Sequence, residues 1–288
     1  MSGAPSVRAR ERRFQVPGLS LAAVEWGGPQ GRPVLAAHGW LDNAGTFDLL
    51  APLLAGCRIV SLDLAGHGAS DSRAPDASYN LWQDVGDLLD VADELGWQRC
   101  CLLGHSRGAA IAMLFAATFP DRVDKLVLLE GGVPFVGKAG DAPQTLAKAL
   151  LERRMLASRN GRVFTDRATA IAERAAGFSK VTNAAAEILA RRSLRSVPGG
   201  FQWHADQRLK GGSEIKLTVE HARAFVRSVT APVLMILAQD SPFGELALYR
   251  DMIAEFRSIE VVRLAGGHHF HLEGAETEIA ARILRFLG

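Results

Sequence analysis

The sequence predicts an α/β fold with a mostly parallel sheet flanked by helices, and two observations support that class. Five short, non-alternating apolar runs have the pattern of strands that are buried on both faces of a parallel sheet. These runs lie at residues 34–37, 59–62, 100–103, 126–129 and 233–237. Segments with helical spacing lie between or after them, at residues 47–54, 81–95, 109–119 and 246–256. Strand and helix therefore alternate, as in βαβ units with right-handed crossovers.

The two ends of the chain complete the predicted sheet. Residues 12–16 and 19–26 have strand composition on either side of Pro17-Gly18, which indicates a hairpin-like start. Near the other end, residues 261–264 form the last predicted strand and residues 276–287 the last predicted helix. The chain thus begins with paired strands and closes with one more strand and helix.

The alternation stops between residues 134 and 230. This segment contains no convincing strand and is rich in helix-favouring Ala, Arg, Glu and Leu. Loops after the carboxyl ends of parallel strands surround the ligand crevice of open α/β sheets. We therefore expect residues 134–230 to form a helical cap over the active site, and residues 1–133 and 231–288 to form the core.

Composition favours a globular protein that acts on a small molecule. The chain has 288 residues, of which 48% are hydrophobic, and a formal net charge of +2. Its Arg residues are scattered, so no basic patch for nucleic acid stands out. No signal-peptide stretch follows the N-terminal arginines, and no apolar run approaches the ~20 residues that span a bilayer. We expect a cytoplasmic protein with a small-molecule substrate and with neither nucleic acid nor membrane as a partner; the oligomeric state stays open.

Three cysteines, Cys57, Cys100 and Cys101, make an odd count, and the last two are adjacent within a predicted strand. Neighbouring side chains of a strand point to opposite faces of the sheet, so these two cannot form a compact metal or disulfide pair. We expect all three to be reduced residues of the core.

The motif with the most chemical content is Gly104-His105-Ser106-Arg107-Gly108, which follows an apolar run and opens a helical stretch. G-x-S-x-G between a strand and a helix is the pattern of a nucleophile elbow, in which glycines let neighbouring backbone pass close to a strained serine. The motif predicts Ser106 as an exposed nucleophile at the top of the sheet.

A serine hydroxyl needs a base, and the base needs a carboxylate to orient it. His268 follows Gly267 in the loop after the last predicted strand and is the predicted base. Two carboxylates compete for the third role: Asp240, three residues beyond the strand at 233–237, and Glu130, at the end of the strand before the cap. Loop position favours Asp240. The nearby His269 and His271 are expected to pack, and no metal centre or cofactor is expected.

Acyl transfer also needs donors aimed at the developing oxyanion. The predicted donors are the backbone N–H of Arg107, directly after the nucleophile, and that of Trp40, in the loop after the strand at 34–37. The guanidinium of Arg107 is expected to pair with a carboxylate, either Glu130 or another, because buried charges need partners. The segment from Asp63 to Ser70 is expected to be a tight structural turn and not a phosphate cradle.

Taken together, the elbow, the His38-Gly39-Trp40 loop, the 63–70 turn and Gly267-His268 resemble the α/β-hydrolase superfamily in order and type. Residues 38–44 and 104–106 are similar to its serine hydrolase-like branch. The resemblance implies an α/β-hydrolase fold with a helical cap, Ser106 as nucleophile, His268 as base, and an oxyanion hole from the backbone of Trp40 and Arg107. Some branches of the superfamily place the acid at the position of Glu130. Haloalkane dehalogenases and epoxide hydrolases carry Asp at the nucleophile position, so Ser106 argues against both chemistries.

The expected activity is hydrolysis of carboxylic esters through an acyl-enzyme on Ser106. Aromatic residues of the predicted cap favour a small, apolar substrate; they are Phe135, Phe164, Phe178, Phe201 and Trp203. Thioesters, lactones and carbon–carbon bonds beside a carbonyl are alternatives on the same scaffold, because the fold does not decide among them. A ligand-binding protein with little turnover is the alternative from another functional class.

Overall fold

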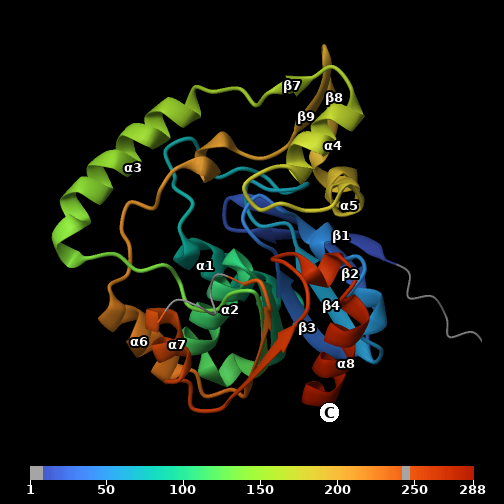
Figure 1. Cartoon of the computed structure of the whole chain (residues 1–288), viewed down its shortest axis with the longest axis vertical. Coiled ribbons are helices and arrows are strands. Elements are labelled where there is room, and N and C mark those ends of the chain that lie inside the picture. Colours follow the sequence, from blue (N-terminus) through green and yellow to red (C-terminus); the bar gives the residue numbers. More distant parts are fainter. Residues whose placement is uncertain (1–8, 242–246) are drawn as a thin grey trace, which may run out of the picture.

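A computed structural model describes residues 9–241 and 247–288 of the chain, and its centre is one eight-stranded sheet (Figure 1). The strands are β1 (Arg10–Val16), β2 (Leu19–Trp26), β3 (Arg32–Ala37), β4 (Cys57–Leu62), β5 (Cys100–His105), β6 (Val123–Leu129), β10 (Val233–Ala238) and β11 (Ile259–Leu264). Their order is β1-β2-β4-β3-β5-β6-β10-β11. The first two pairings are antiparallel and the rest are parallel. All eight predicted strands are confirmed.

Helices cover both faces of the sheet, and each face has its own apolar core. One core joins the sheet to α1 (Leu81–Glu94), α2 (Arg107–Thr118), α6 (Val219–Ser228) and α7 (Ala247–Ile253). The other joins it to α8 (Glu276–Leu287) and to the 3₁₀ turns η1 (Ala44–Phe47) and η2 (Ala51–Leu53). Alternate residues of each central strand enter opposite cores, which explains why these strands are apolar throughout. The predicted helix at 47–54 is replaced by the two 3₁₀ turns, and residue 246 of another predicted helix lies outside the described residues.

The three cysteines are free and buried, as expected. Cys100 belongs to the first core and Cys101 to the second, so their side chains do lie on opposite faces of β5. Burial raises the pKa of the Cys100 thiol to about 12 and that of Cys101 to about 11. All three thiols are therefore protonated and shielded in the folded protein.

The inserted segment is less purely helical than its composition predicts. It contains α3 (Ala142–Ala157), α4 (Arg167–Ala175) and α5 (Asn183–Ser193), but also β7 (Val163–Phe164), β8 (Leu194–Val197) and β9 (Gly200–Trp203). These strands form a small antiparallel sheet in the order β7-β9-β8. Gly199 and Gly200 turn the chain between β8 and β9 with φ of 89° and 143°. The expectation that the segment holds no strand is therefore wrong, because such short strands leave almost no periodicity in the sequence.

The last helix of the predicted cap, α6, packs on the core instead. Its residues Ala222 and Val226 are fully buried in the same apolar cluster as α2. The chain thus returns from the cap to the core before residue 219, earlier than the predicted boundary at 230. In Figure 1 the remaining cap elements lie beyond one end of the sheet, with α3 at the outer edge.

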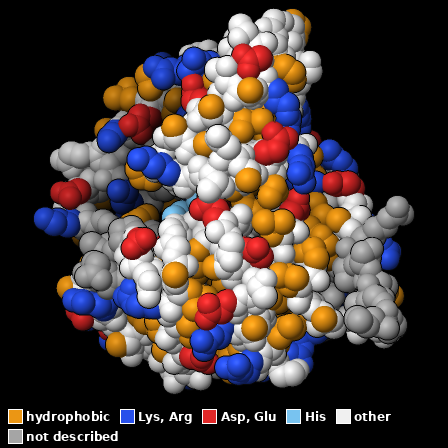
Figure 2. All heavy atoms as spheres, turned by 45° about the vertical axis from the view of Figure 1, so that its right-hand side comes forward, with side chains coloured by type: hydrophobic (Ala, Val, Ile, Leu, Met, Phe, Trp, Pro, Cys, Tyr) orange, Lys and Arg blue, Asp and Glu red, His pale blue; other side chains and the backbone are white. Residues whose placement is uncertain are grey.

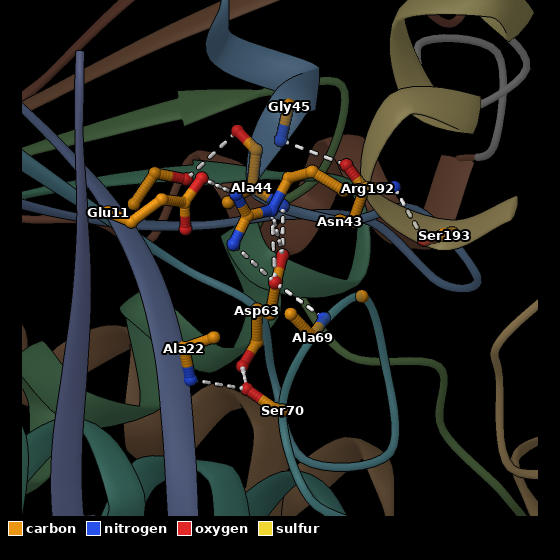
Figure 3. A network of polar contacts seen from close by, with 12 residues as sticks. Glu11, Ala22, Asn43, Ala44, Gly45, Asp63, Ala69, Ser70, Arg192 and Ser193 are labelled. Atoms are coloured by element: carbon orange, nitrogen blue, oxygen red, sulfur yellow. Dashed lines mark hydrogen bonds and ion pairs between the residues drawn. The ribbon is translucent and has the colours of Figure 1, made fainter. Parts of the chain in front are cut away.

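A buried ionic network fastens the cap to the core through Asp63, which follows β4 (Figure 3). The Asp63 carboxylate accepts hydrogen bonds from the backbone N–H of Ala44 at 2.7 Å and of Ala69 at 2.8 Å. Nη2 of Arg192, on α5, donates to it at 2.8 Å. The Ser70 hydroxyl donates to the carbonyl oxygen of Asp63. The 63–70 segment is thus a structural turn, as expected, and it also anchors α5.

None of the helices formed by residues 9–241 and 247–288 is both long enough and apolar enough to cross a bilayer.

Candidate active site

Ser106 lies in a strained turn between β5 and α2. Its φ of 52° and ψ of −114° belong to a region that L-residues rarely adopt. Glycines make room for this turn: a Cβ on Gly104 would lie 2.4 Å from the carbonyl oxygen of Gly108, and a Cβ on Gly108 would lie 2.0 Å from that of Ala37. The predicted elbow is therefore present, and its shape depends on both motif glycines.

His268 contacts Ser106 on one side and Glu130 on the other. Its Nε2 lies 3.0 Å from Oγ of Ser106, and its Nδ1 lies 3.1 Å from Oε2 of Glu130. The imidazole is partly accessible, with 24% of its side chain exposed, whereas the Glu130 side chain is fully buried. Because a carboxylate only accepts, the proton of a neutral His268 belongs on Nδ1, which leaves Nε2 free to accept the serine proton.

The preference for Asp240 as the orienting acid is corrected by this arrangement. The backbone N–H of Glu130 donates to the carbonyl oxygen of Ile236 at 3.0 Å. Oε1 of Glu130 accepts from the N–H of Ala238 at 2.6 Å, so β10 fixes the carboxylate in place. Asp240, two residues beyond the end of β10, has an exposed side chain. The pairing of β6 with β10 thus places Glu130 beside His268, and loop position alone cannot reveal that pairing.

The two predicted oxyanion donors lie on segments that meet at the elbow. Arg107 is the first residue of α2, and Trp40 lies in the loop after β3. A Cβ on Gly108 would also approach the carbonyl oxygen of His38 to 2.7 Å, so the start of α2 touches that loop. The indole of Trp40 donates to the carbonyl oxygen of Leu209 at 2.8 Å and so connects the loop to the cap.

Positive φ at non-glycine residues is concentrated around this site. Within the described part of the chain it occurs at Leu41 with 59°, Ser106 with 52° and Glu130 with 49°. These residues belong respectively to the Trp40 loop, the elbow and the end of β6. Such conformations cost free energy and persist where the surroundings enforce them, typically at functional sites.

The guanidinium of Arg107 pairs with a carboxylate, as expected, but the partner is Asp84 of α1 and not Glu130. Nη2 of Arg107 lies 2.5 Å from Oδ2 of Asp84, whose other oxygen is 3.3 Å from Arg73. Arg73 in turn binds Asp87 at 2.5 Å. The positive charge of Arg107 is thus compensated by a carboxylate of α1, and Glu130 contacts His268 and Ala238 instead.

A cluster of buried imidazoles lies behind His268. The ring of His105 is centred 4.9 Å from those of His268 and His269 and 4.2 Å from that of His271. His271 binds the hydroxyl of Thr46 at 2.9 Å. Burial and the neighbouring rings hold the pKa of His105 and of His271 well below the usual range, so both are neutral.

Asp42 is the functional candidate that the sequence reasoning missed. Its carboxylate lies 3.0 Å from Nε2 of His269 and 2.8 Å from Nη2 of Arg174, on α4 of the cap. Potential ligand atoms of Asp42, His105 and His269 come within 4.8 Å of one another. The available signal was its position two residues after Trp40, in the loop expected to supply an oxyanion donor.

A cavity of about 350 Å³ lies between the Trp40 loop and the cap. Aromatic residues and basic residues share its wall, which includes Trp40, Phe178, Trp203, Arg174, His204 and Lys210. Other cap aromatics differ in environment: Phe164 is buried, whereas Phe135 is 74% exposed. The wall of this cavity is therefore more polar than we expected from the aromatic residues of the cap alone. On the face shown in Figure 2, a histidine side chain is visible within a hollow of the surface.

Comparisons with known proteins agree with this geometry. Residues 32–275 match the family described as alpha/beta hydrolase fold. A serine hydrolase-like protein of Danio rerio is 33% identical over 97% of this chain and 88% of its own length. Serine hydrolase-like protein 2 of Homo sapiens is 30% identical over 96% and 93%.

Solved structures add two further likenesses. A hypothetical protein from Pseudomonas aeruginosa PAO1 superposes with a TM-score of 0.92 and is 43% identical over 96% of this chain and 99% of that one. A thioesterase domain from the curacin biosynthetic pathway superposes with a TM-score of 0.83 and is 25% identical over the same shares.

Proposed function

Because the chain belongs to the α/β-hydrolase fold family, we propose that it is a serine hydrolase that cleaves carboxylic esters of small, largely apolar molecules through an acyl-enzyme on Ser106. The observation that carries the proposal is the continuous chain from Oγ of Ser106 through His268 to Glu130, with links of 3.0 and 3.1 Å. Both distances are within hydrogen-bond reach: the first link allows the serine proton to pass to His268, and the second orients the imidazole.

In the first half of the proposed reaction, Oγ of Ser106 attacks the ester carbonyl carbon while Nε2 of His268 takes the hydroxyl proton. The buried carboxylate of Glu130 stabilises the imidazolium that forms, and the backbone N–H groups of Trp40 and Arg107 stabilise the oxyanion. His268 then gives its proton to the leaving alkoxide oxygen. The alcohol departs, and the acyl group remains on Ser106.

In the second half, His268 takes a proton from a water molecule whose oxygen attacks the acyl carbon. The bond to Oγ breaks, His268 returns the proton to Ser106, and a carboxylic acid is released. No redox step and no external reductant or oxidant enters this sequence. The complete triad also argues against a protein that only binds a ligand, because such a protein has no need of a buried orienting acid.

Thioesters are a second candidate class, which the likeness to the curacin thioesterase domain supports. The same attack on a carbonyl carbon would release a thiol in place of an alcohol. Lactones and carbon–carbon bonds beside a carbonyl have no comparable support here.

The test is the initial rate of hydrolysis of p-nitrophenyl esters from acetate to octanoate by the wild type, Ser106→Ala and Ser228→Ala. Ser228 is at the exposed end of α6, so its variant controls for the loss of a hydroxyl. Activity that disappears only in Ser106→Ala is expected, and matched thioesters then rank the two classes. Activity that persists in Ser106→Ala would refute the assigned nucleophile.

A further inference from the structure

We propose that Asp42 is a positioning residue of this site. It fixes the loop that carries His268 relative to the Trp40 loop and connects both loops to the cap. The inference rests on the proposed function, since it names what sets the geometry of the same triad. The side chain of Asp42 is hydrogen-bonded to His269 and Arg174, so its effect on His268 passes through His269, Arg174 and the backbone.

The first step is the charge state of Asp42. Its side chain is almost fully buried, and burial alone would raise its pKa, yet His269 and Arg174 hold the pKa well below the usual range. Asp42 is therefore an ionised carboxylate with both oxygens in use: Oδ2 for His269 and Oδ1 for Arg174. A buried charge with two fixed partners holds them in one geometry, because losing either contact leaves it uncompensated.

The second step leads from Asp42 to the catalytic imidazole. The carboxylate can only accept, so His269 carries its proton on Nε2, which fixes the ring next to His268 in the chain. His105 supports the same segment, because its Nε2 donates to the backbone carbonyl oxygen of His268 at 2.9 Å. Nδ1 of His105 then has no proton and faces Oδ2 of Asp42 at 3.7 Å. Of these two rings only that of His269 is hydrogen-bonded to Asp42, so the effect of Asp42 on His268 passes through His269, while His105 holds the backbone of His268 independently.

The third step concerns the Trp40 loop, which lies on the other side of Asp42. Leu41, with its φ of 59°, separates Asp42 from Trp40, and the N–H of Leu41 donates to Nε2 of His67 at 3.3 Å. A Cβ on Gly39 would lie 3.0 Å from Oδ2 of Asp42. The same carboxylate therefore braces the predicted oxyanion donor and the base, two groups that must keep a fixed separation for acyl transfer.

The cluster of Asp42, His105 and His269 suits hydrogen bonding better than a cation. The negative charge of Asp42 is already compensated by Arg174, so a divalent ion would add a net positive charge beside a buried guanidinium. Oδ2 of Asp42 is also engaged by a protonated ring nitrogen of His269. These contacts indicate that the cluster holds its neighbours in place by hydrogen bonds and does not bind a metal ion.

The chain supplies a matched control in Asp63. Asp42 and Asp63 are both buried carboxylates that pair with an arginine of the cap, Arg174 on α4 and Arg192 on α5. Of these two carboxylates, only Asp42 is also hydrogen-bonded to His269, in the loop that carries His268. Comparing Asp42→Asn with Asp63→Asn therefore separates positioning of His268 from attachment of the cap, while His269→Phe removes the hydrogen bond between Asp42 and the loop that carries His268 and leaves the contact with Arg174 in place.

The experiment measures kcat and KM on a p-nitrophenyl ester, the thermal unfolding temperature, and the downfield NMR signal of the imidazole proton between His268 and Glu130. We expect Asp42→Asn and His269→Phe to lose about 10²-fold in kcat, the size that a misplacement of about 1 Å produces, with KM within threefold. Their imidazole signal should broaden or disappear. Asp63→Asn should lower the unfolding temperature and keep both kcat and the signal.

Two results would overturn the proposal: a folded Asp42→Asn variant with wild-type kcat and an unchanged imidazole signal, or an equal loss of both in Asp63→Asn. If Asp42→Asn does not fold, His269→Phe decides by the same measures. If the wild type hydrolyses no ester and Ser106 does not react with a fluorophosphonate, the proposed function fails. The imidazole signal still decides whether Asp42 positions His268 in that case.

Discussion

Replacing Glu130 by Gln would remove one charge from the triad with almost no change of shape. The amide oxygen can still accept from the N–H of Ala238, which now lies 2.6 Å from Oε1. The amide nitrogen then faces Nδ1 of His268 across 3.1 Å and donates to it. His268 must in response carry its own proton on Nε2, the atom 3.0 Å from Oγ of Ser106.

The magnitude follows from this tautomer. With a proton on Nε2, His268 cannot accept the serine proton, and the loss of the buried negative charge also destabilises the imidazolium. The same substitution of a triad carboxylate by its amide costs about 10⁴ in kcat in serine proteases, or about 5 kcal/mol of transition-state stabilisation. Glu130 is fully buried beneath His268, so KM should stay within about threefold of the wild type.

The assay compares Glu130→Gln with Asp240→Asn on the best p-nitrophenyl ester, with the fraction of active protein set by fluorophosphonate titration. Asp240 is exposed, so its variant should keep kcat within about twofold of the wild type, as surface changes usually have small effects. A Glu130→Gln variant that keeps more than a tenth of wild-type kcat would refute the assigned acid. A large loss in Asp240→Asn would restore that residue as the candidate.

Two further predictions concern stability. Gly108→Ala should lower the free energy of unfolding by more than about 3 kcal/mol, because its Cβ would meet the carbonyl oxygen of Ala37 at 2.0 Å. Gly86→Ala, in α1 with open space at its Cβ, should instead raise it by about 1 kcal/mol; urea unfolding of both checks this, and equal stability would contradict it. The second prediction is that the free energy of unfolding decreases as pH falls below about 6.5, because burial lowers the pKa of five histidines, so the unfolded chain binds more protons. These histidines are His38, His67, His105, His204 and His271. Asp48 and Asp87, whose pKa values burial raises to about 6, act in the opposite direction but are fewer; urea unfolding that gives an equal or higher free energy at pH 5.5 than at 7.5 would contradict the prediction.

The elbow was predictable because its requirements are local. A strand, two glycines and a helix within about a dozen residues determine the backbone at Ser106, and each leaves a mark in the sequence. The same holds for the buried strands, whose apolar runs reflect two cores. The contact between His268 and Ser106 was equally predictable, since His268 lies in the loop that follows the last strand.

The acid and its surroundings depend on contacts between distant segments. Glu130 is held beside His268 because β6 pairs with β10, and the paired residues are more than a hundred positions apart in the sequence. Asp42 reaches His269 and Arg174 across similar separations. The cap strands β7, β8 and β9 escaped prediction for another reason: strands of two to four residues are too short to show alternation.

The three buried thiols can report how often the folded protein opens. Cys100 and Cys101 lie on opposite faces of the central strand β5, and Cys57 lies on β4. A thiol reagent in solution can reach them only when the sheet separates from its helices, so the rate of modification reports how often that happens. By contrast, we expect a serine-directed reagent to react with Ser106 in the folded molecule. The two reagents used side by side would separate loss of the nucleophile from loss of the fold in every variant described above.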